Sequence, residues 1–217
     1  REHVEVVQIT VAEELGVVPE VGIRVNLSDI PVPAWDRFGF NLEGGRALEA
    51  ARRLARGRKL ELRALHGHVG TFILDPDAYR LAARGIARLA NQLDREFGIR
   101  IDTVDLGGGF ASYNTLLGQY LPGEEVTPSL GQYVERLAAG FDEGFDGAQI
   151  PRVMLETGRA LVDDAAILVS TVVGNKRLVD GRRAVILDAG VNILPTAWWY
   201  RHDVHPAQPS HGTPEPT

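Results

Sequence analysis

Residues 101–110 read Ile-Asp-Thr-Val-Asp-Leu-Gly-Gly-Gly-Phe, a short β-compatible segment that continues directly into three glycines. Such a segment is typical of a buried strand that ends in a tight loop. On either side of it the apolar residues have helical spacing, at 77–97, which stops at Gly98, and at 130–145. We therefore predict a strand at 101–106 between two helices.

The same alternation extends outward from this strand. Further strands are expected at 21–25, 60–69 and 153–155, with another helix at 44–56. Strands separated by helices in this way predict parallel βα units. A closed barrel of eight such units takes about 250 residues, so residues 1–160 hold only half of one. These observations leave two alternatives, a small open sheet or part of a larger fold.

After Gly158 the pattern changes to β-rich. Strands are predicted at 165–173 and 183–187, joined through the turn-forming pair Asp180-Gly181, which favours an antiparallel hairpin. We also expect a short apolar run at 4–7 and a loose tail at 206–217. The predicted domains are therefore residues 1–160 and residues 161–217.

The composition excludes several classes of protein. The chain has 217 residues, 44% hydrophobic and 24% charged, which is typical of a folded globular protein. The net charge is −6 without a basic block, so we expect no nucleic-acid partner. No apolar run approaches the about 20 residues that span a membrane. The absence of cysteine excludes disulfides and thiolate metal sites within this sequence.

Polar and glycine residues follow three of the predicted strands, at 65–71, 105–110 and 155–159. Ligands bind at the carboxyl ends of strands in parallel α/β folds. Each group alone has a plain alternative. The glycines form either an anion-binding loop or a tight turn. His66 and His68 are either a ligand-binding pair or histidines of the core. Glu156 and Arg159 belong either to a ligand-binding site or to a surface ion pair.

The ordered set of motifs resembles the fold-type III pyridoxal-phosphate decarboxylases, which act on diaminopimelate, ornithine or arginine. Residues 65–71 are similar to the family's Leu-His-x-His-x-Gly-Ser, and residues 105–110 match its Asp-Leu-Gly-Gly-Gly-Phe. Residues 156–159 match Glu-Pro-Gly-Arg with Thr157 in place of proline. Of the three branches, the diaminopimelate decarboxylases have the motif sequences most similar to these segments.

Two further segments support the resemblance. Arg24-Val25-Asn26 with Phe38-Gly39-Phe40 resembles the Arg-Val-Asn and Lys-Phe-Gly segments, although Arg37 replaces the lysine. Residues 188–192 resemble Asp-Ala-Gly-Met-Asn of the family's second, β-rich domain. The implied fold is the C-terminal part of a (β/α)8 TIM-like barrel, followed by the beginning of an antiparallel β domain.

The resemblance implies pyridoxal 5′-phosphate as cofactor and an amino acid as substrate. His68 would stack on the pyridine ring, Glu156 would face the ring nitrogen, and His66 would be structural. These residues supply orientation and electrostatics to chemistry that the cofactor performs. No metal is expected. The remaining expected cofactor-binding residues, mainly around the phosphate, are Arg24, Thr71, Gly107, Gly108, Gly109, Gly158 and Arg159.

Two expected residues of the family have no counterpart here. The lysine that forms the Schiff base lies upstream of the Arg-Val-Asn segment, and neither Lys59 nor Lys176 is in a matching position. The cysteine that reaches the partner subunit lies beyond the last residue. We therefore interpret the chain as an internal fragment of a cytoplasmic, homodimeric decarboxylase with shared active sites.

The sequence does not determine which amino acid is the substrate. Diaminopimelate enzymes, which serve lysine biosynthesis, carry an arginine in the segment that corresponds to 193–200, where this chain has Trp198 and Trp199 but no arginine. These tryptophans are either core residues or part of an altered substrate pocket, as in a decarboxylase of secondary metabolism. Two other functions remain as alternatives: a non-catalytic protein that binds the cofactor, and a metal-dependent barrel hydrolase that uses His66 and His68.

Overall fold

The computed structural model describes residues 11–57, 59–145, 147 and 149–207. The chain divides into two compact units, Arg1–Ala111 with Pro128–Ala160, and Ser112–Thr127 with Leu161–Thr217. The predicted apolar run at 4–7 and the tail from 208 onward lie outside the described residues. Each unit is described by itself below.

The first unit contains a parallel sheet, which confirms the predicted α/β class. Its strand order is β2-β1-β3-β4-β5, and every neighbouring pair is parallel. The short strand β2 was not predicted; it pairs with the carboxyl end of β1 and forms one edge of the sheet, with β5 at the other. The strand bounds are β1 (Glu20–Asn26), β2 (Phe40–Asn41), β3 (Glu61–Gly67), β4 (Thr103–Asp105) and β5 (Arg152–Met154).

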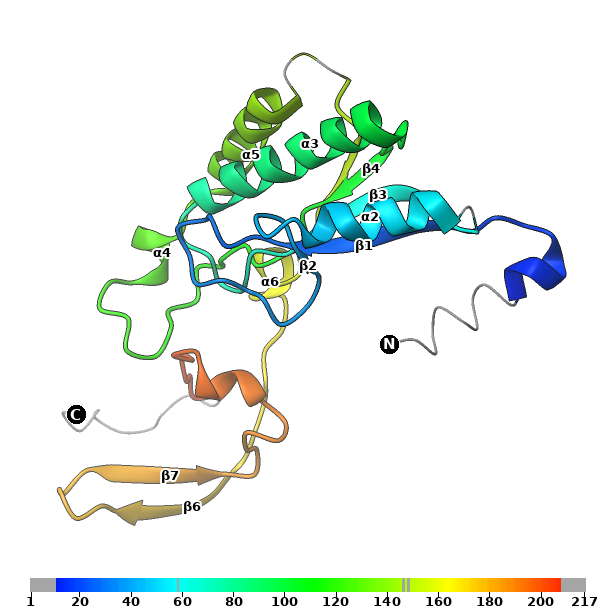
Figure 1. The fold of residues 1–217 in the computed structure, drawn as a ribbon. Coiled ribbons are helices and arrows are strands. Elements are labelled where there is room, and N and C mark those ends of the chain that lie inside the picture. Colours follow the sequence, from blue (N-terminus) through cyan, green and yellow to red (C-terminus); the bar gives the residue numbers. More distant parts are fainter. Residues whose placement is uncertain (1–10, 58, 146, 148, 208–217) are drawn as a thin grey trace. The chain divides into compact units, whose positions relative to one another are not determined.

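Three long helices connect these strands, and each lies within two residues of its predicted range. They are α2 (Arg46–Gly57), α3 (Asp77–Phe97) and α5 (Leu130–Phe145), as Figure 1 shows. Helix α3 ends at Gly98, whose φ of 65° is left-handed and whose amide donates to the carbonyl oxygen of Asp94. Glycine adopts this conformation without steric cost, which explains the sharp end of the helix.

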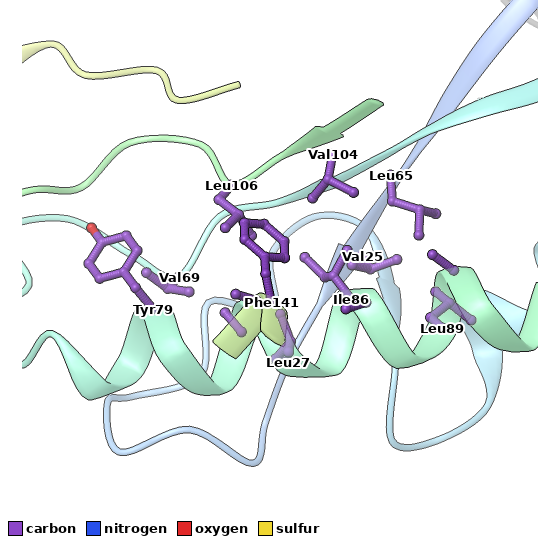
Figure 2. Packing of buried hydrophobic residues seen from close by; sticks show 14 of the residues in the cluster. Val25, Leu27, Leu65, Val69, Tyr79, Ile86, Leu89, Val104, Leu106 and Phe141 are labelled. Atoms are coloured by element: carbon purple, nitrogen blue, oxygen red, sulfur yellow. The ribbon is translucent and has the colours of Figure 1, made fainter. Parts of the chain in front are cut away.

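The core of this unit lies between the sheet and the helices. Val25, Leu65 and Val104 are fully buried, and Ile86 and Leu89 of α3 belong to the same cluster (Figure 2). Burial of each such side chain contributes about 1.5–3 kcal/mol. Because side chains alternate along a strand, the intervening residues of β1, β3 and β4 point to the opposite face of the sheet.

Helices α3 and α5 approach each other closely through small residues. A Cβ atom at Gly140 would lie 2.1 Å from the carbonyl oxygen of Arg80, and one at Gly144 would lie 2.4 Å from Cβ of Ala87. The guanidinium of Arg80 also donates to the Glu143 carboxylate at 3.0 Å. The two glycines therefore allow backbone contact between the helices.

The second unit contains the hairpin β6 (Val172–Arg177) and β7 (Arg183–Leu187), which are antiparallel as predicted. Gly181 of the predicted turn has a φ of 86°. The predicted strand at 165–173 is wrong for residues 165–171. The pairing between β6 and β7 ends at Val172, opposite Leu187, because β7 ends there. Thr171, the residue before Val172, donates its amide to the Asp188 carboxylate instead.

The rest of the second unit is short segments: α4 (Gly123–Val126) and a 3-10 helix, η1 (Pro195–Trp198). Helix α6 (Arg159–Val162) begins in the first unit and ends in the second. Trp198 and Trp199 are exposed in this chain. Among the described residues, no helix is long and apolar enough to cross a membrane.

Candidate functional site

A row of polar residues crosses the face of the sheet that the helices leave uncovered. Arg24 of β1 is the register partner of His66 of β3, which in turn is the partner of Asp105 of β4. Nε2 of His66 lies 3.8 Å from Oε2 of Glu156, two residues after β5. The ligand atoms of His66, Asp105 and Glu156 all lie within 4.8 Å of one another. The structure thus brings the predicted residues His66 and Glu156 together.

The ends of β3, β4 and β5 are joined by hydrogen bonds around the glycine loop, residues 107–109. The amide of Gly108 donates to Nδ1 of His68, the first residue after β3, at 3.2 Å. The amide of Gly107 donates to the Asp105 carboxylate at 2.8 Å, and its carbonyl oxygen accepts from the amide of Glu156 at 2.8 Å. The loop therefore fixes His68 and Glu156 relative to each other.

Close contacts explain why this loop consists of glycines. Gly107 and Gly109 have φ values of 65° and 93°, where other residues are strained. A Cβ at Gly108 would lie 2.5 Å from the carbonyl oxygen of Glu156, and one at Gly109 would lie 2.2 Å from that of Gly70. The backbone packing of three strand ends would not accommodate a side chain at either position.

The surroundings of His68 favour the neutral form of its imidazole. Burial lowers the pKa of His68, and the nearby Arg24 and His66 lower it further, against smaller opposite effects of Glu156 and Asp105. Because Nδ1 accepts the hydrogen bond from Gly108, the proton of the neutral ring resides on Nε2. His68 therefore offers a flat, uncharged ring.

A second cluster lies where the loops after β3, β4 and β5 come close. The amide of Ile73 donates to the carbonyl oxygen of Gly109 at 2.9 Å, which joins the segment that contains Thr71 to the glycine loop. The guanidinium of Arg159 lies over the Phe72 ring, 5.7 Å from its centre. Thr71 and Gly158, neighbours of these two residues, are exposed.

Arg24 lies at the other side of the site, 5.2 Å from the centre of the Phe38 ring. Phe38 belongs to the loop between β1 and β2, residues 27–39, whose end is fixed because the Asn26 amide group donates to the carbonyl oxygens of Phe38 and Gly39. In the same loop, Trp35 contacts His68, with ring centres 6.1 Å apart.

The sequence did not single out three residues that contribute to this site, namely Asp105, Tyr79 and Trp35. Asp105 was treated only as part of a motif, although alternation along the strand places it on the face opposite the buried Val104. Tyr79, on α3, donates its hydroxyl to the carbonyl oxygen of Gly108 at 3.0 Å. For Tyr79 and Trp35 no local pattern gives a signal, because both contacts depend on tertiary packing.

The residues fit a ligand that has an aromatic ring beside His68 and Glu156 and an anionic group near the guanidinium of Arg159. Nε2 of His66 is buried and has no hydrogen-bond partner among the described residues, and Glu156 offers an exposed carboxylate beside it. Neither lysine belongs to this cluster. Lys59 precedes β3, at the opposite end of the strand, where it pairs with Glu13 at 2.8 Å, and Lys176 is part of β6 in the second unit.

Comparison with known proteins gives matches that include all of this site. Residues 4–163 match the family model described as pyridoxal-dependent decarboxylase, pyridoxal binding domain. The diaminopimelate decarboxylase of Corynebacterium efficiens is 33% identical over 77% of this chain and 37% of its own length. That of Actinosynnema pretiosum is 37% identical over 73% of this chain and 34% of its own length. The chain thus spans about a third of the length of these relatives.

A solved structure has the same fold. The crystal structure of diaminopimelate decarboxylase from Helicobacter pylori complexed with L-lysine has a TM-score of 0.68 and 25% sequence identity. It covers 93% of this chain, which in turn covers 49% of that chain. The similarity includes the parallel sheet whose strand ends carry the candidate site.

Proposed function

The chain belongs to the pyridoxal-dependent decarboxylase family, and from this premise we propose that its protein removes CO2 from an amino acid by means of pyridoxal 5′-phosphate. The observation that carries the proposal is the connection of three strand ends, in which the glycine loop fixes both His68 and Glu156. A flat ring, a carboxylate and a glycine loop that lets backbone approach a phosphate suit this cofactor.

The phosphate end of the proposed site consists of Arg159, Thr71 and Gly109. An arginine forms strong, charge-assisted hydrogen bonds with phosphate, and the Thr71 segment is joined to Gly109 through Ile73. The amides of Gly107 and Gly108 already donate to Asp105 and His68. We therefore assign these two glycines to the shape of the loop, which lets backbone approach the phosphate closely.

The ring end of the proposed site consists of Glu156 and His68. The bound cofactor supplies a ring that accepts the electron pair left when CO2 departs. Glu156 would accept a hydrogen bond from the ring nitrogen and keep its proton in place, and His66, 3.8 Å away, would limit the movement of the carboxylate. His68 would pack against the ring, and in its neutral form it would not repel a protonated pyridine.

We further propose that residues 1–160 are part of a (β/α)8 barrel domain and residues 161–217 the beginning of a β-rich domain. The parallel order of the sheet and the separate antiparallel hairpin support this assignment. The lysine that holds the cofactor is then supplied by another part of the protein, since Lys59 pairs with Glu13 away from the site. Homodimerisation with shared active sites and a cytoplasmic location remain predictions from the resemblance.

For the substrate we propose diaminopimelate or another basic or diamino acid, because the relatives named above are diaminopimelate decarboxylases. The test uses the protein expressed from its complete reading frame. It is titrated with pyridoxal phosphate while absorbance is recorded, and CO2 release is then measured with diaminopimelate, lysine, ornithine and arginine. We expect saturable binding and CO2 release from at least one amino acid.

Each other result of this experiment has a definite meaning. Saturable binding without CO2 release from any of the four would favour the non-catalytic alternative. No binding at all would contradict the proposed function. Size-exclusion chromatography with light scattering on the same sample tests the predicted dimer.

A metal-dependent hydrolase is the second candidate, because His66, Asp105 and Glu156 could together hold an ion. This alternative predicts that a chelator abolishes activity and that added Zn²⁺ restores it, whereas pyridoxal phosphate has no effect. Membership of the family favours the first candidate.

A further inference from the structure

The loop of residues 27–39 begins at the same end of the sheet as the candidate site, because it follows the carboxyl end of β1. Hydrogen bonds hold both of its ends. The Glu43 carboxylate accepts from the amides of Ser28 and Asp29 at 3.1 and 3.2 Å, and the Asn26 side chain holds the carbonyl groups of Phe38 and Gly39. The loop is thus fixed at its base.

The middle of the loop is also anchored. Ile30 and Val32 are partly buried and pack against the core of the first unit. Pro31 and Pro33, which alternate with them, fix their own φ angles and limit the conformations of the chain. Trp35 is separated from this anchored stretch by Ala34 alone, so its backbone starts near a well-defined position.

Trp35 contacts the ring of His68. The ring centres are 6.1 Å apart and the planes are inclined by 61°, a favoured geometry for an aromatic pair. The imidazole also accepts a hydrogen bond at Nδ1 from the Gly108 amide, at 3.2 Å. The terminal torsion of a histidine has broad minima, so a single hydrogen bond leaves the ring plane free to tilt.

We propose that Trp35 is a positioning residue that holds the plane of His68 at the orientation in which it packs against the pyridine ring of the cofactor. The inference rests on the proposed function and adds to it a residue, Trp35, that no matched motif contains. The hydrogen bond from the Gly108 amide and the contact with Trp35 both restrict rotation about the Cβ–Cγ bond of His68. Together they restrict the ring plane more than the hydrogen bond does alone.

The expected effect is moderate, because Trp35 acts through His68 and is 37% exposed. An aromatic contact of this kind accounts for about two- to tenfold in a binding equilibrium. Trp35→Ala should therefore raise the dissociation constant of pyridoxal phosphate by about two- to tenfold, while Trp35→Phe, which keeps an aromatic ring, should restore most of the affinity.

The experiment uses the protein from its complete reading frame, with ¹⁵N-labelled histidine. The dissociation constant of pyridoxal phosphate is measured by titration, and the ring nitrogen signals of His68 are recorded without cofactor. Tyr120→Ala is the matched control, because Tyr120 is an exposed aromatic residue of the second unit. We expect Trp35→Ala to change both measurements and Tyr120→Ala to change neither. Thermal unfolding identifies any variant that fails to fold, and Trp35→Phe then carries the test.

Three results would overturn the proposal. If the wild-type protein binds the cofactor and Trp35→Ala leaves both affinity and His68 signals unchanged, only the role of Trp35 is wrong. If Trp35→Ala binds the cofactor more tightly, Trp35 occupies space that the cofactor needs. If the wild-type protein does not bind pyridoxal phosphate, the proposed function itself fails, and the role of Trp35 with it.

Discussion

The amide of Glu156 donates a hydrogen bond to the carbonyl oxygen of Gly107 at 2.8 Å. This bond joins the loop after β5 to the loop after β4, so the carboxylate of Glu156 and the glycine loop cannot shift independently. The two ends of a ligand, one at the carboxylate and one at the loop, are therefore held at a fixed separation. Variants that alter this connection should affect ligand binding more than overall stability.

Gly108→Ala should weaken binding of pyridoxal phosphate at least tenfold. The added Cβ would lie 2.5 Å from the carbonyl oxygen of Glu156, so the loops after β4 and β5 must separate. The measurement is the dissociation constant by absorbance titration. Gly57→Ala is the control, because nothing lies within 4 Å of its Cβ; equal affinities of the two variants would contradict the role of the loop.

Glu156→Gln should retain the cofactor but lower the rate of CO2 release by on the order of a hundredfold. The neutral amide cannot stabilise a positive charge on the ring nitrogen, whereas it still fits the space. The rate is measured by CO2 release at saturating cofactor. Glu49→Gln, which removes an exposed ion pair on α2, should behave like wild type, and a wild-type rate for Glu156→Gln would disprove the assignment.

Tyr79→Phe and Tyr133→Phe separate the positioning of the loop from general stability. Tyr79 donates to the carbonyl oxygen of Gly108 and Tyr133 to that of Ile73, both in buried positions. Each variant leaves a buried carbonyl unsatisfied, which should cost about 1–3 kcal/mol of unfolding free energy in a denaturation experiment. Only Tyr79→Phe should also weaken cofactor binding, since Gly108 is part of the loop that holds His68.

Much of the first unit could be predicted from the sequence, because its pattern is strong. Residues 77–97 present one apolar face and stop at Gly98, and α3 has these bounds. The strand at 165–173 was misplaced for a physical reason. Apolar residues there suggested burial, but Ile167 is 90% exposed, and the hairpin extends only as far as β7 provides partners.

The candidate site was predictable in part. His66 and Glu156 could be assigned to the candidate site because each lies near the carboxyl end of a predicted strand, where parallel sheets bind ligands. The contributions of Tyr79 and Trp35 could not be, because they depend on how α3 and the loop at 27–39 pack. The side-chain partners of the Gly107 and Gly108 amides likewise became visible only in three dimensions.

Gly140→Ala should destabilise the protein by several kcal/mol, because its Cβ would lie 2.1 Å from the carbonyl oxygen of Arg80 and force α3 and α5 apart. Gly131→Ala is a matched control at an exposed position of the same helix. There alanine should stabilise the helix by about 0.5–1 kcal/mol. Thermal unfolding measures both, and a similar change in the two variants would contradict the close approach of the helices.

The loop at 27–39 should loosen in acid. Burial raises the pKa of Glu43, but hydrogen bonds from the amides of Glu43 and Asp29 and from Ser28 outweigh it, so the pKa lies below its ordinary value of 4.5. Because the pKa of Glu43 is lower in the folded than in the unfolded protein, its ionised carboxylate stabilises the fold fully above pH 4.5. This stabilisation is lost as the pH falls through the pKa of the folded state. The difference in unfolding free energy between wild type and Glu43→Gln should be constant near neutral pH and shrink below 4.5. A difference that stays constant down to pH 3 would show that Glu43 does not titrate in this way.

The alternation of β3 also determines which genetic changes this site tolerates. Leu65 points into the core, whereas His66 next to it faces the candidate site. Two neighbouring residues therefore belong to different parts of the protein, one to the core and one to the candidate site. A point substitution at His66 should therefore change the candidate site and leave the core intact. Insertion or deletion of a single codon within the strand would exchange the two faces of the strand and so disrupt the core and the candidate site together.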